Sequence, residues 1–550
     1  MMDVQLTTQA LLPRCLTLFP ERPVTSLMVA GKNEAGQPTA SRHRTTLGQV
    51  ARRSAQLAGA LQQLGVQPGD RVATLAVNSF YHLEAYLGIP SMGAVIHTLN
   101  IRLPIEQLVW ILNDSGAKVL LLDSMFLPLL PAFRAQCPEL KEVIVFSAQV
   151  PEGTHGYDDL ISSQPETYAW PELDEKSGAM LCYTSGTTGN PKGVLYTHRS
   201  LMLHALASGH PDAFGIGQYD VVLPIVPMFH ANAWGTVHTA LLYGAGLAFT
   251  GVFNDGPSVA RTLQDEKATM CAGVVTVMLA LLEELDRAAA AGQPYDVSAL
   301  NKIGCGGTAV PEVLIRALYE RHGLQMMQAW GMTETSPLAT CSNVPAGIDP
   351  VSDEGFAHRS KQGRVVPFIE VALLDDHGQP VTHDGATMGR LLVRGPWIAG
   401  EYYKRGVTSD FVELDGKKWL DTGDIATISA SGEVWVQDRA KDLVKSGGEW
   451  ISSAEVENAL MAHPGVSAAV VVAVPHPKWT ERPLALFIPH GDAPSPAELR
   501  EYLKGHIAKW WIPDDFLAVS ELPIGATGKF LKREIREQYK NHVWTDGGMK

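Results

Sequence analysis

The chain has 550 residues, which exceeds what one hydrophobic core usually supports, so we expect two to four domains. Apolar residues make up 45% and charged residues 19% of the chain, which excludes a mostly disordered protein. The formal charge of −14 argues against a nucleic-acid partner, because nucleic-acid-binding proteins usually carry a basic excess.

The cysteines and the apolar segments indicate in which cellular compartment the protein works. Six cysteines lie far apart and form no CxxC motif, and the N-terminus lacks the basic region of a signal peptide. No apolar run approaches the 18 residues or so of a membrane span. We therefore expect a cytoplasmic protein with reduced thiols and no transmembrane segment.

Strand and helix signals alternate from the N-terminus onward. Strands are predicted over 70–77, 94–100 and 118–123, with helices over 82–94 and 103–117 between them. A second block has predicted strands over 221–229, 245–251 and 268–277, and predicted helices over 203–209, 236–246 and 277–292. Alternation at this spacing indicates βαβ units with parallel sheets.

The pattern changes after about residue 360. Short strands separated by turn signals are predicted over 368–381, 388–403, 418–429 and 432–439, which indicates a small β-rich subdomain. From 443 onward, predicted helices over 451–466 and 495–510 mix with strands over 467–476 and 482–490. The predicted fold class is α/β, with two α/β subdomains and a β-rich subdomain followed by a small α+β C-terminal domain.

The strongest local motif is YTSGTTGNPKG at 183–193. It follows a short apolar strand and precedes residues 194–208, for which we expect a helix. Glycines, hydroxyls and a lysine are typical of a phosphate-binding loop, although a polar surface turn is the plain alternative. In a kinase-type GxxxxGK[ST] loop, Pro191 would be glycine and Gly193 would be the hydroxyl ligand of magnesium, which disfavours a phosphotransferase.

This motif resembles the phosphate loop of the ANL adenylate-forming enzymes, which include acyl- and aryl-CoA synthetases. Further segments resemble that family's motifs in order: PMFHANAW (227–234), GCGGTAVP (304–311), QAWGMTETSP (328–337), WLDTGD (419–424), DRAKDLVKSGGEWIS (438–452) and LPIGATGKFLKREIR (522–536). The resemblance implies two half-reactions, in which ATP and a carboxylic acid give an acyl-adenylate and coenzyme A then takes the acyl group.

The resemblance also implies roles for individual residues. Lys529, His230, Thr184 and Lys192 would be catalytic, and Thr184 and Glu334 would hold Mg²⁺. ATP or AMP would be bound by Thr184, Ser185, Gly186, Thr187, Thr188, Gly189, Lys192, Gly306, Gly307, Thr308, Gln328, Ala329, Trp330, Gly331, Met332, Thr333, Asp424, Arg439, Lys445 and Trp450. The acyl site would comprise His230, Ala231, Trp234, Gly235, Cys305 and Gly331.

The resemblance also implies that the C-terminal domain moves between the two half-reactions. The expected division is an N-terminal domain over 1–437, a hinge over 438–442 and a lid over 443–550. Asp438, Lys441, Gly447, Gly448 and Glu449 would form the hinge and the CoA passage, with Lys441 at the pivot.

The segments KSGGEWIS, FHANAW and YTSGTTGNPKGVLYTHRS most resemble those of medium- and long-chain fatty acyl-CoA ligases, which implies an aliphatic carboxylic acid of medium or long chain as the substrate. An amino-acid substrate is disfavoured because FHANAW lacks the acidic residue that amino-acid-activating relatives use. An aryl, short branched or sulfur-containing acid is the alternative within the family, and a non-catalytic acyl-binding protein is the alternative outside it. The residues Val275 and Cys305 differ from those of many relatives at these positions, so the acyl chain length of the substrate stays open. A homodimer is a further possibility.

Overall fold

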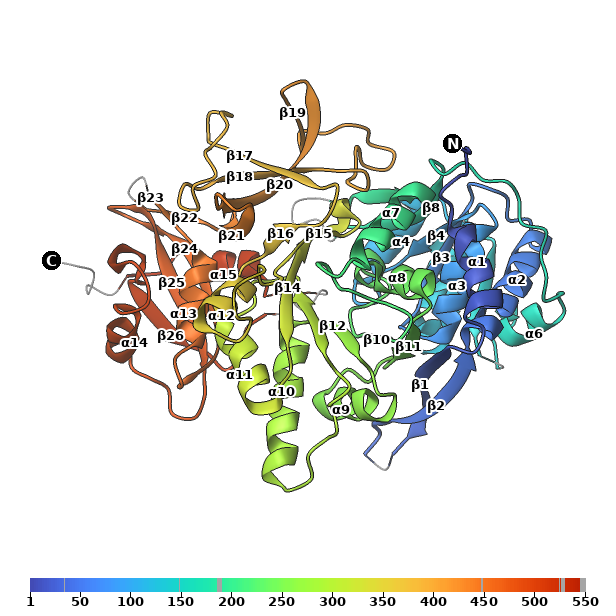
Figure 1. The fold of residues 1–550 in the computed structure, drawn as a ribbon, viewed down its shortest axis with the longest axis horizontal. Helices are drawn as coiled ribbons and strands as arrows, with labels where there is room; N and C mark the ends of the chain where they lie inside the picture. The colour runs from blue at the N-terminus through green and yellow to red at the C-terminus, as the bar shows by residue number, and fades with distance from the viewer. Residues whose placement is uncertain are drawn as a thin grey trace.

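A computed structural model describes residues 1–33, 35–147, 149–184, 190–446, 449–523, 525 and 530–544, with the side chain of Glu449 left out. Among these residues the strands form three sheets (Figure 1). The architecture is mixed α/β, as predicted.

The first sheet has the order β7-β6-β5-β3-β4-β8-β9. Its strands are β3 (Arg71–Leu75), β4 (Val95–Thr98), β5 (Val119–Asp123), β6 (Glu142–Phe146), β7 (His155–Gly156), β8 (Gly178–Tyr183) and β9 (Gly193–Thr197). Only β9 runs antiparallel to its neighbour among these described strands. The accompanying helices are α2 (Leu47–Gln63), α3 (Phe80–Ser91), α4 (Ile105–Ser115), α5 (Leu130–Gln136), α6 (Tyr157–Ser162) and α7 (His198–Ser208).

The second sheet joins the second α/β block to the β-rich region in the order β17-β18-β20-β21-β16-β15-β14-β13-β12-β10-β11-β1-β2, with β19 beside β20. Its α/β part comprises β1 (Pro23–Lys32), β2 (Pro38–Thr46), β10 (Val221–Pro224), β11 (Gly246–Phe249), β12 (Met270–Val274), β13 (Lys302–Gly306) and β14 (Met326–Gly331). The β-rich part comprises β15 (Leu338–Cys341), β16 (Gly363–Val365), β17 (Glu370–Leu374), β18 (Gly389–Arg394), β19 (Phe411–Leu414), β20 (Lys417–Ile428) and β21 (Glu433–Arg439). The helices of this region are α8 (Thr236–Tyr243), α9 (Gly256–Asp265), α10 (Val275–Ala290), α11 (Glu312–His322) and α12 (Asp353–Arg359).

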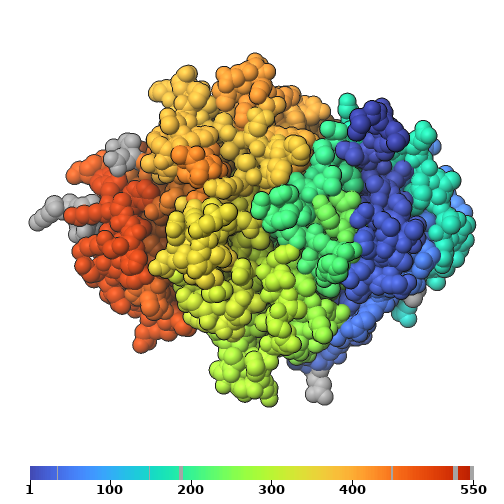
Figure 2. All heavy atoms as spheres, in the orientation of Figure 1, coloured from blue at the N-terminus to red at the C-terminus, as the bar shows by residue number. Residues whose placement is uncertain are grey.

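The third sheet gathers near the C-terminus, at the opposite end of the molecule from the first sheet (Figures 1 and 2). It comprises β22 (Val444–Ser446), β23 (Glu449–Ile451), β24 (Val466–His476), β25 (Thr480–Pro489) and β26 (Asp515–Ala518). Helices α13 (Ser453–Met461), α14 (Pro496–Leu503) and α15 (Lys532–Tyr539) accompany it.

The hydrophobic cores follow this arrangement. One large core includes residues from Leu11 to Leu420 and therefore packs both α/β blocks and part of the β-rich region together. The cores of the C-terminal part begin at Val444 and contain only residues after it. No described core cluster crosses residues 438–442, so the two parts are joined at that point without a shared core.

One element differs from its prediction. Residues 194–208 were expected to be helical, but Gly193–Thr197 forms strand β9 and only His198–Ser208 is helix α7. In β9 the burial alternates, with Val194 and Tyr196 buried and Leu195 exposed, because the strand pairs with β8. The Thr197 side chain then accepts a hydrogen bond from the Ser200 backbone N–H and so caps the helix.

Candidate active site

The base of the glycine-rich loop is a closed β8–β9 hairpin. The Thr184 N–H donates to the Lys192 carbonyl at 2.9 Å, and the Lys192 N–H donates to Thr184 Oγ1 at 3.3 Å. The intervening Ser185, Gly186, Thr187, Thr188 and Gly189 lie outside the described residues. The hairpin thus holds Thr184 and Lys192 side by side at the mouth of the loop.

Lys192 begins a chain of polar contacts. Its ammonium lies 2.6 Å from Asp410 Oδ2 and 4.6 Å from the centre of the Tyr402 ring. The Tyr402 hydroxyl in turn donates to Glu334 Oε1 at 2.8 Å. Although partial burial of Asp410 opposes it, hydrogen bonding from Lys192 and Thr408 lowers the pKa of the Asp410 carboxyl. Segments far apart in the sequence therefore meet around one cation and one buried acid.

Glu334 is a buried carboxyl, with 6% of the residue exposed. Burial raises its pKa, while the Tyr402 hydrogen bond and the charges of Arg439 and Lys192 act in the lowering direction. Its backbone is held as well, because the Ala399 N–H donates to the Glu334 carbonyl and the Tyr196 hydroxyl donates to the Thr333 carbonyl. A buried carboxylate with one oxygen engaged by Tyr402 suits a divalent cation bound mainly through substrate phosphates, since Mg²⁺ is usually held by one or two carboxylates plus phosphate oxygens.

Trp330, Asp424 and Arg439 form a second group. The Trp330 indole N–H donates to Asp424 Oδ2 at 2.9 Å, and Arg439 Nε lies 2.7 Å from Asp424 Oδ1. Asp424 on β20 and Arg439 on β21 face each other in the ladder, and 2% of Asp424 is exposed. The structure brings these three predicted residues together, and it uses the indole edge of Trp330 to hold the carboxylate.

The glycine segment beside Trp330 is tightly packed. A Cβ on Gly306 would lie 2.3 Å from the Ala329 carbonyl oxygen and 3.4 Å from the Trp234 ring, and Gly307 has φ +85°. A Cβ on Gly331 would lie 1.9 Å from the Pro337 carbonyl oxygen. Only glycine fits these positions without a backbone shift.

The remaining predicted nucleotide residues lie around this segment. Gln328 is 1% exposed, its side chain accepts from the Val310 N–H, and its amide donates to the Ser360 carbonyl at 3.1 Å. Gln328 and Ala329 are on β14, Thr308 follows β13, and Met332 directly precedes Thr333. Gln328 therefore ties the segment after β13 to β14.

The predicted acyl segment has an unusual backbone. Ala231, Asn232, Ala233 and Trp234 have φ values of 43°, 58°, 49° and 56°, and Gly235 follows at 72°. A left-handed run of non-glycine residues is strained by roughly 1–2 kcal/mol each, so the surrounding structure must hold it. A Cβ on Gly235 would lie 2.3 Å from the His204 ring, which leaves only glycine at the end of the turn.

His230 directly precedes this turn, and the Trp234 ring faces the bare Cα of Gly306. Cys305 is fully buried in a core cluster with residues of α10 and α11, and burial raises the pKa of its thiol. The structure thus brings Trp234 to the adenine-side glycines, whereas Cys305 points into the core.

Among the predicted lid residues, Lys445 and Trp450 face each other across the β22–β23 hairpin, with the Lys445 ammonium 5.9 Å from the ring. Asp438 and Lys441 lie at the junction of the two parts of the molecule. Gly447, Gly448, the Glu449 side chain and Lys529 lie outside what the structure describes.

Tyr402 and Asp410 belong to this site but were not predicted from the sequence. They lie at the end of the long segment after β18, outside the recognised motifs. The tandem aromatics Tyr402-Tyr403 in a glycine-containing loop were the only local signal.

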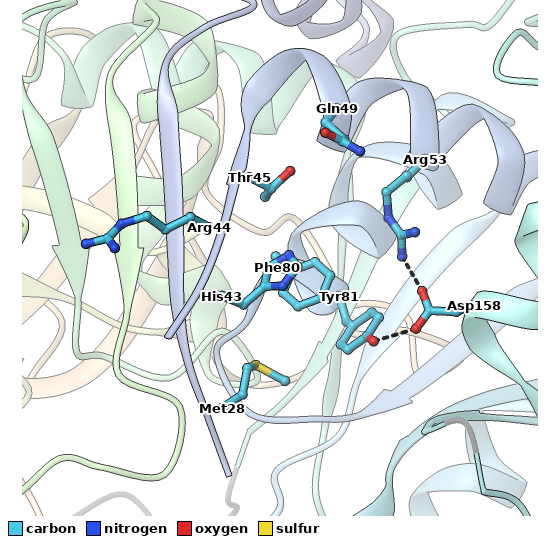
Figure 3. Close-up of a pocket in the computed structure, with 9 residues that line it drawn as sticks. All are labelled: Met28, His43, Arg44, Thr45, Gln49, Arg53, Phe80, Tyr81 and Asp158. Atoms are coloured by element: carbon cyan, nitrogen blue, oxygen red, sulfur yellow. Dashed lines mark hydrogen bonds and ion pairs between the residues drawn. The ribbon is translucent and has the colours of Figure 1, made fainter. Parts of the chain in front are cut away.

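A cavity of about 490 Å³ lies elsewhere, between the β1–β2 hairpin and helices α2 and α3 (Figure 3). It is lined by Met28, His43, Arg44, Thr45, Gln49, Arg53, Phe80, Tyr81 and Asp158. Its charged groups already have partners: Arg53 lies 2.7 Å from Asp158 Oδ1, the Tyr81 hydroxyl donates to Asp158 Oδ2 at 2.7 Å, and Arg44 lies 3.0 Å from Glu266. None of the predicted site residues lines it, so we assign it no part in the chemistry.

Comparisons with known proteins identify the class. Residues 26–403 match the AMP-binding enzyme family, and residues 455–529 match the AMP-binding enzyme C-terminal domain. The chain therefore belongs to the AMP-binding enzyme family, which confirms the resemblance found in the motifs.

Particular relatives are similar over nearly the whole chain. A long-chain-fatty-acid–CoA ligase of Thermus thermophilus is 42% identical and covers 98% of this chain and 97% of its own length. A 3-methylmercaptopropionyl-CoA ligase of Ruegeria lacuscaerulensis is 42% identical (90% and 92% covered), and a medium-chain-fatty-acid–CoA ligase of Ectopseudomonas oleovorans is 41% identical (89% and 90%). The crystal structure of the anthranilate CoA ligase AuaEII in complex with anthranoyl-AMP has a TM-score of 0.85 at 27% identity, with 98% of both chains covered.

Within the described part of the chain, none of the helices combines the length and the apolar character needed to cross a bilayer.

Proposed function

We propose that this protein is an ATP-dependent acyl-CoA ligase for an aliphatic carboxylic acid, forming acyl-CoA, AMP and pyrophosphate. The observation that carries the proposal is the meeting of a cation, Lys192, with a buried acid, Glu334, through Tyr402, beside the Trp330–Asp424–Arg439 group. Lys192 and Glu334 suit a polyphosphate, because they offer a cation and a carboxylate for a metal ion. The Trp330–Asp424–Arg439 group suits a nucleoside, because it offers an oriented acceptor for the ribose hydroxyls.

In the first half-reaction, a carboxylate oxygen of the acid attacks the α-phosphorus of ATP, and the bond from that phosphorus to the bridging oxygen breaks to release pyrophosphate. Negative charge grows on the phosphate oxygens, so fixed cations should supply much of the rate enhancement. Lys192 neutralises the departing phosphates, and Asp424 accepts hydrogen bonds from the ribose hydroxyls. We assign Lys529 the role of the cation that contacts the α-phosphate of ATP and the carboxylate of the acid.

Mg²⁺, held by Glu334 and the Thr184 hydroxyl, would supply further charge neutralisation of the phosphates. In the second half-reaction, the thiol of coenzyme A attacks the acyl carbon, its proton is lost to solvent, and the acyl–phosphate bond breaks to release AMP. His230 would border the acyl group at this stage, and Gly447 and Gly448 would line the thiol passage. Residues 443–550 would act as the lid that turns at Lys441 between the two steps.

For the substrate, we propose a medium- or long-chain fatty acid. Relatives named for long-chain and medium-chain fatty acids support this, and so does the apolar Trp234 at the predicted acyl site. A sulfur-containing acid is the second candidate, because a relative at 42% identity is named for 3-methylmercaptopropionyl-CoA.

The test is pyrophosphate release with a panel of acids, with and without coenzyme A. The panel includes C6–C12 fatty acids, palmitate, 3-methylmercaptopropionate and anthranilate. We expect the highest kcat/KM on a fatty acid, with AMP as the product. Formation of ADP would contradict the reaction, and acid binding without pyrophosphate release would favour a non-catalytic acyl-binding protein.

Lys529→Ala tests the assigned cation. We expect adenylate formation to fall while transfer from a supplied acyl-adenylate to coenzyme A continues. Lys540→Ala is the matched control, because Lys540 is an exposed lysine paired with Glu537 in the same C-terminal region. Equal loss of both half-reactions in Lys529→Ala would refute the role.

We further propose a cytoplasmic homodimer. All six cysteine thiols are free and buried, which suits a reducing compartment. Strand β2 ends the second sheet with mostly exposed residues, and such an edge can pair with a second copy. Light scattering should give twice the 59.5 kDa chain mass, and a mass of one chain would exclude the dimer.

A further inference from the structure

A buried charge cluster joins the hinge to helix α15. The Lys532 ammonium lies 2.7 Å from Glu457 Oε1 and donates to Ser453 Oγ at 2.6 Å. The Ser453 backbone N–H donates to Asp438 Oδ2 at 2.7 Å, and the Ser453 hydroxyl donates to the same oxygen. The cluster therefore runs without a break from Asp438 in the hinge to Lys532 at the start of α15.

A second contact lies one helical turn further along α15. Arg536 lies 2.8 Å from Asp442 Oδ1 and also donates to the Lys441 carbonyl. Lys532 and Arg536 are four residues apart and share one face of the helix. That face is turned toward the hinge residues 438–442.

The cluster is shielded from water. Asp438 is 7% exposed, and the side chains of Lys532 and Glu457 are 16% and 13% exposed. Burial raises the pKa of Glu457 to about 7, with Lys532 acting in the opposite direction. Burial opposes the charge on Lys532 too, but Glu457 and Asp438 outweigh it and raise its pKa. Removing one partner leaves another buried charge uncompensated, so the members depend on one another.

The two ends of the cluster belong to different parts of the molecule. The Asp438 backbone is in β21 of the second sheet, opposite Ile425, whereas Ser453, Glu457 and Lys532 are on helices of the C-terminal part. The neighbouring Ser452 hydroxyl likewise donates to the Gln437 carbonyl at 2.6 Å. Because Lys441 follows Asp438 in the chain, a turn of the C-terminal part at Lys441 must separate Asp438 from Ser453.

We propose that Asp438, Ser453, Lys532 and Glu457 form a latch that holds the C-terminal domain in the orientation seen here. The latch opens when the domain turns. Lys532 follows Lys529 by three residues, so the latch fixes one end of the segment that carries the proposed catalytic cation. Its members are positioning residues for adenylate formation, and this assignment rests on the function proposed above.

The test separates the two half-reactions. Asp438→Ala and Ser453→Ala are assayed by ATP–pyrophosphate exchange and by transfer from a supplied acyl-adenylate to coenzyme A. We expect each variant to lower kcat of exchange by about tenfold, the effect of losing one charge-assisted hydrogen bond, with little change in the KM for ATP. The transfer step should keep its rate or gain, because the latch is open when it occurs.

Two controls guard the interpretation. Ser453→Thr keeps the hydroxyl and should restore exchange toward the wild-type rate. Ser467→Ala removes an exposed serine of the same domain and should change neither step. Equal loss of both half-reactions in Ser453→Ala, or no change in either, would overturn the latch.

A structural measurement keeps the latch testable apart from the activity. Spin labels on Val313→Cys of α11 and Glu501→Cys of α14, both exposed positions, report the distance between the two parts. Asp438→Ala should broaden or shift the distance distribution, and an unchanged distribution would contradict the proposal. If the wild type shows no pyrophosphate exchange, the proposed function fails while the distance measurement still decides the latch.

Discussion

Asp424 is the carboxylate on which the nucleotide assignment depends most directly. It is 2% exposed, and its two oxygens are oriented by Trp330 at 2.9 Å and by Arg439 at 2.7 Å. We expect Asp424→Ala to weaken ATP binding because the ribose hydroxyls lose their charged acceptor. It also leaves the partly buried indole N–H of Trp330 without this partner.

The size of the effect follows from the geometry. A hydrogen bond to a charged group contributes about 1.5–3 kcal/mol, and about 1.4 kcal/mol corresponds to a factor of ten. One such interaction with the ribose predicts a rise of about 30-fold in the KM for ATP. The side chain of Arg439 is 40% exposed, so losing its pair with Asp424 adds little to the change in stability.

The assay is ATP–pyrophosphate exchange over a range of ATP concentrations, with thermal unfolding measured alongside. Asp220→Ala is the matched control: Asp220 is 8% exposed and accepts from Thr269 Oγ1 at 2.7 Å, but it precedes β10, at the end of the strands away from the glycine segment. That variant should lower the Tm and leave the KM for ATP unchanged. A KM within twofold of wild type in folded Asp424→Ala would refute the ribose assignment.

Three further predictions concern other residues. Lys192→Met should lower the rate of ATP–pyrophosphate exchange at least tenfold, whereas Asp410→Asn, which removes the anionic partner of the Lys192 ammonium, should not. Gly331→Ala should lower the denaturant midpoint, because its Cβ would lie 1.9 Å from the Pro337 carbonyl oxygen, while Gly400→Ala, in open space, should not. Burial raises the pKa of Asp123 from 3.8 to about 7, so the stability that this group contributes is full below about pH 4 and is lost as the pH rises through about 7. Asp123→Asn keeps an acceptor for the Val77 N–H but cannot ionise. Its unfolding free energy should therefore rise relative to wild type by up to about 4 kcal/mol between pH 4 and pH 8. A difference between the two proteins that stays constant over this pH range would contradict the assignment.

The parallel strands could be predicted from the sequence because strands buried on both faces are continuous apolar runs. The segments predicted at 70–77, 94–100 and 118–123 became β3, β4 and β5 with ends shifted by a few residues. Strand β9 was missed because its partner β8 lies across the glycine-rich loop, and the pairing decides between strand and helix where local preference is ambiguous.

The motif residues could be recognised because their chemistry is concentrated in short segments. Tyr402 and Asp410 could not, because each acts on a residue that is distant in the chain, Glu334 and Lys192. The left-handed turn from Ala231 to Trp234 was equally hidden, since no residue type in it favours that backbone except Asn232.

The site also explains how a chain of charge −14 can take a polyanion. Two of its described cations, Lys192 and Arg439, already have carboxylate partners, and the exposure of each pair decides whether a ligand can replace the carboxylate. The Lys192–Asp410 pair is about one-third exposed on both sides, so water screens it and incoming phosphates can replace Asp410. In the Arg439–Asp424 pair the carboxylate is buried, so this acceptor stays in place and orients the nucleoside. We therefore expect ATP binding to break the first pair and to leave the second intact, so that the exposed cation serves the phosphates while the buried anion serves the ribose.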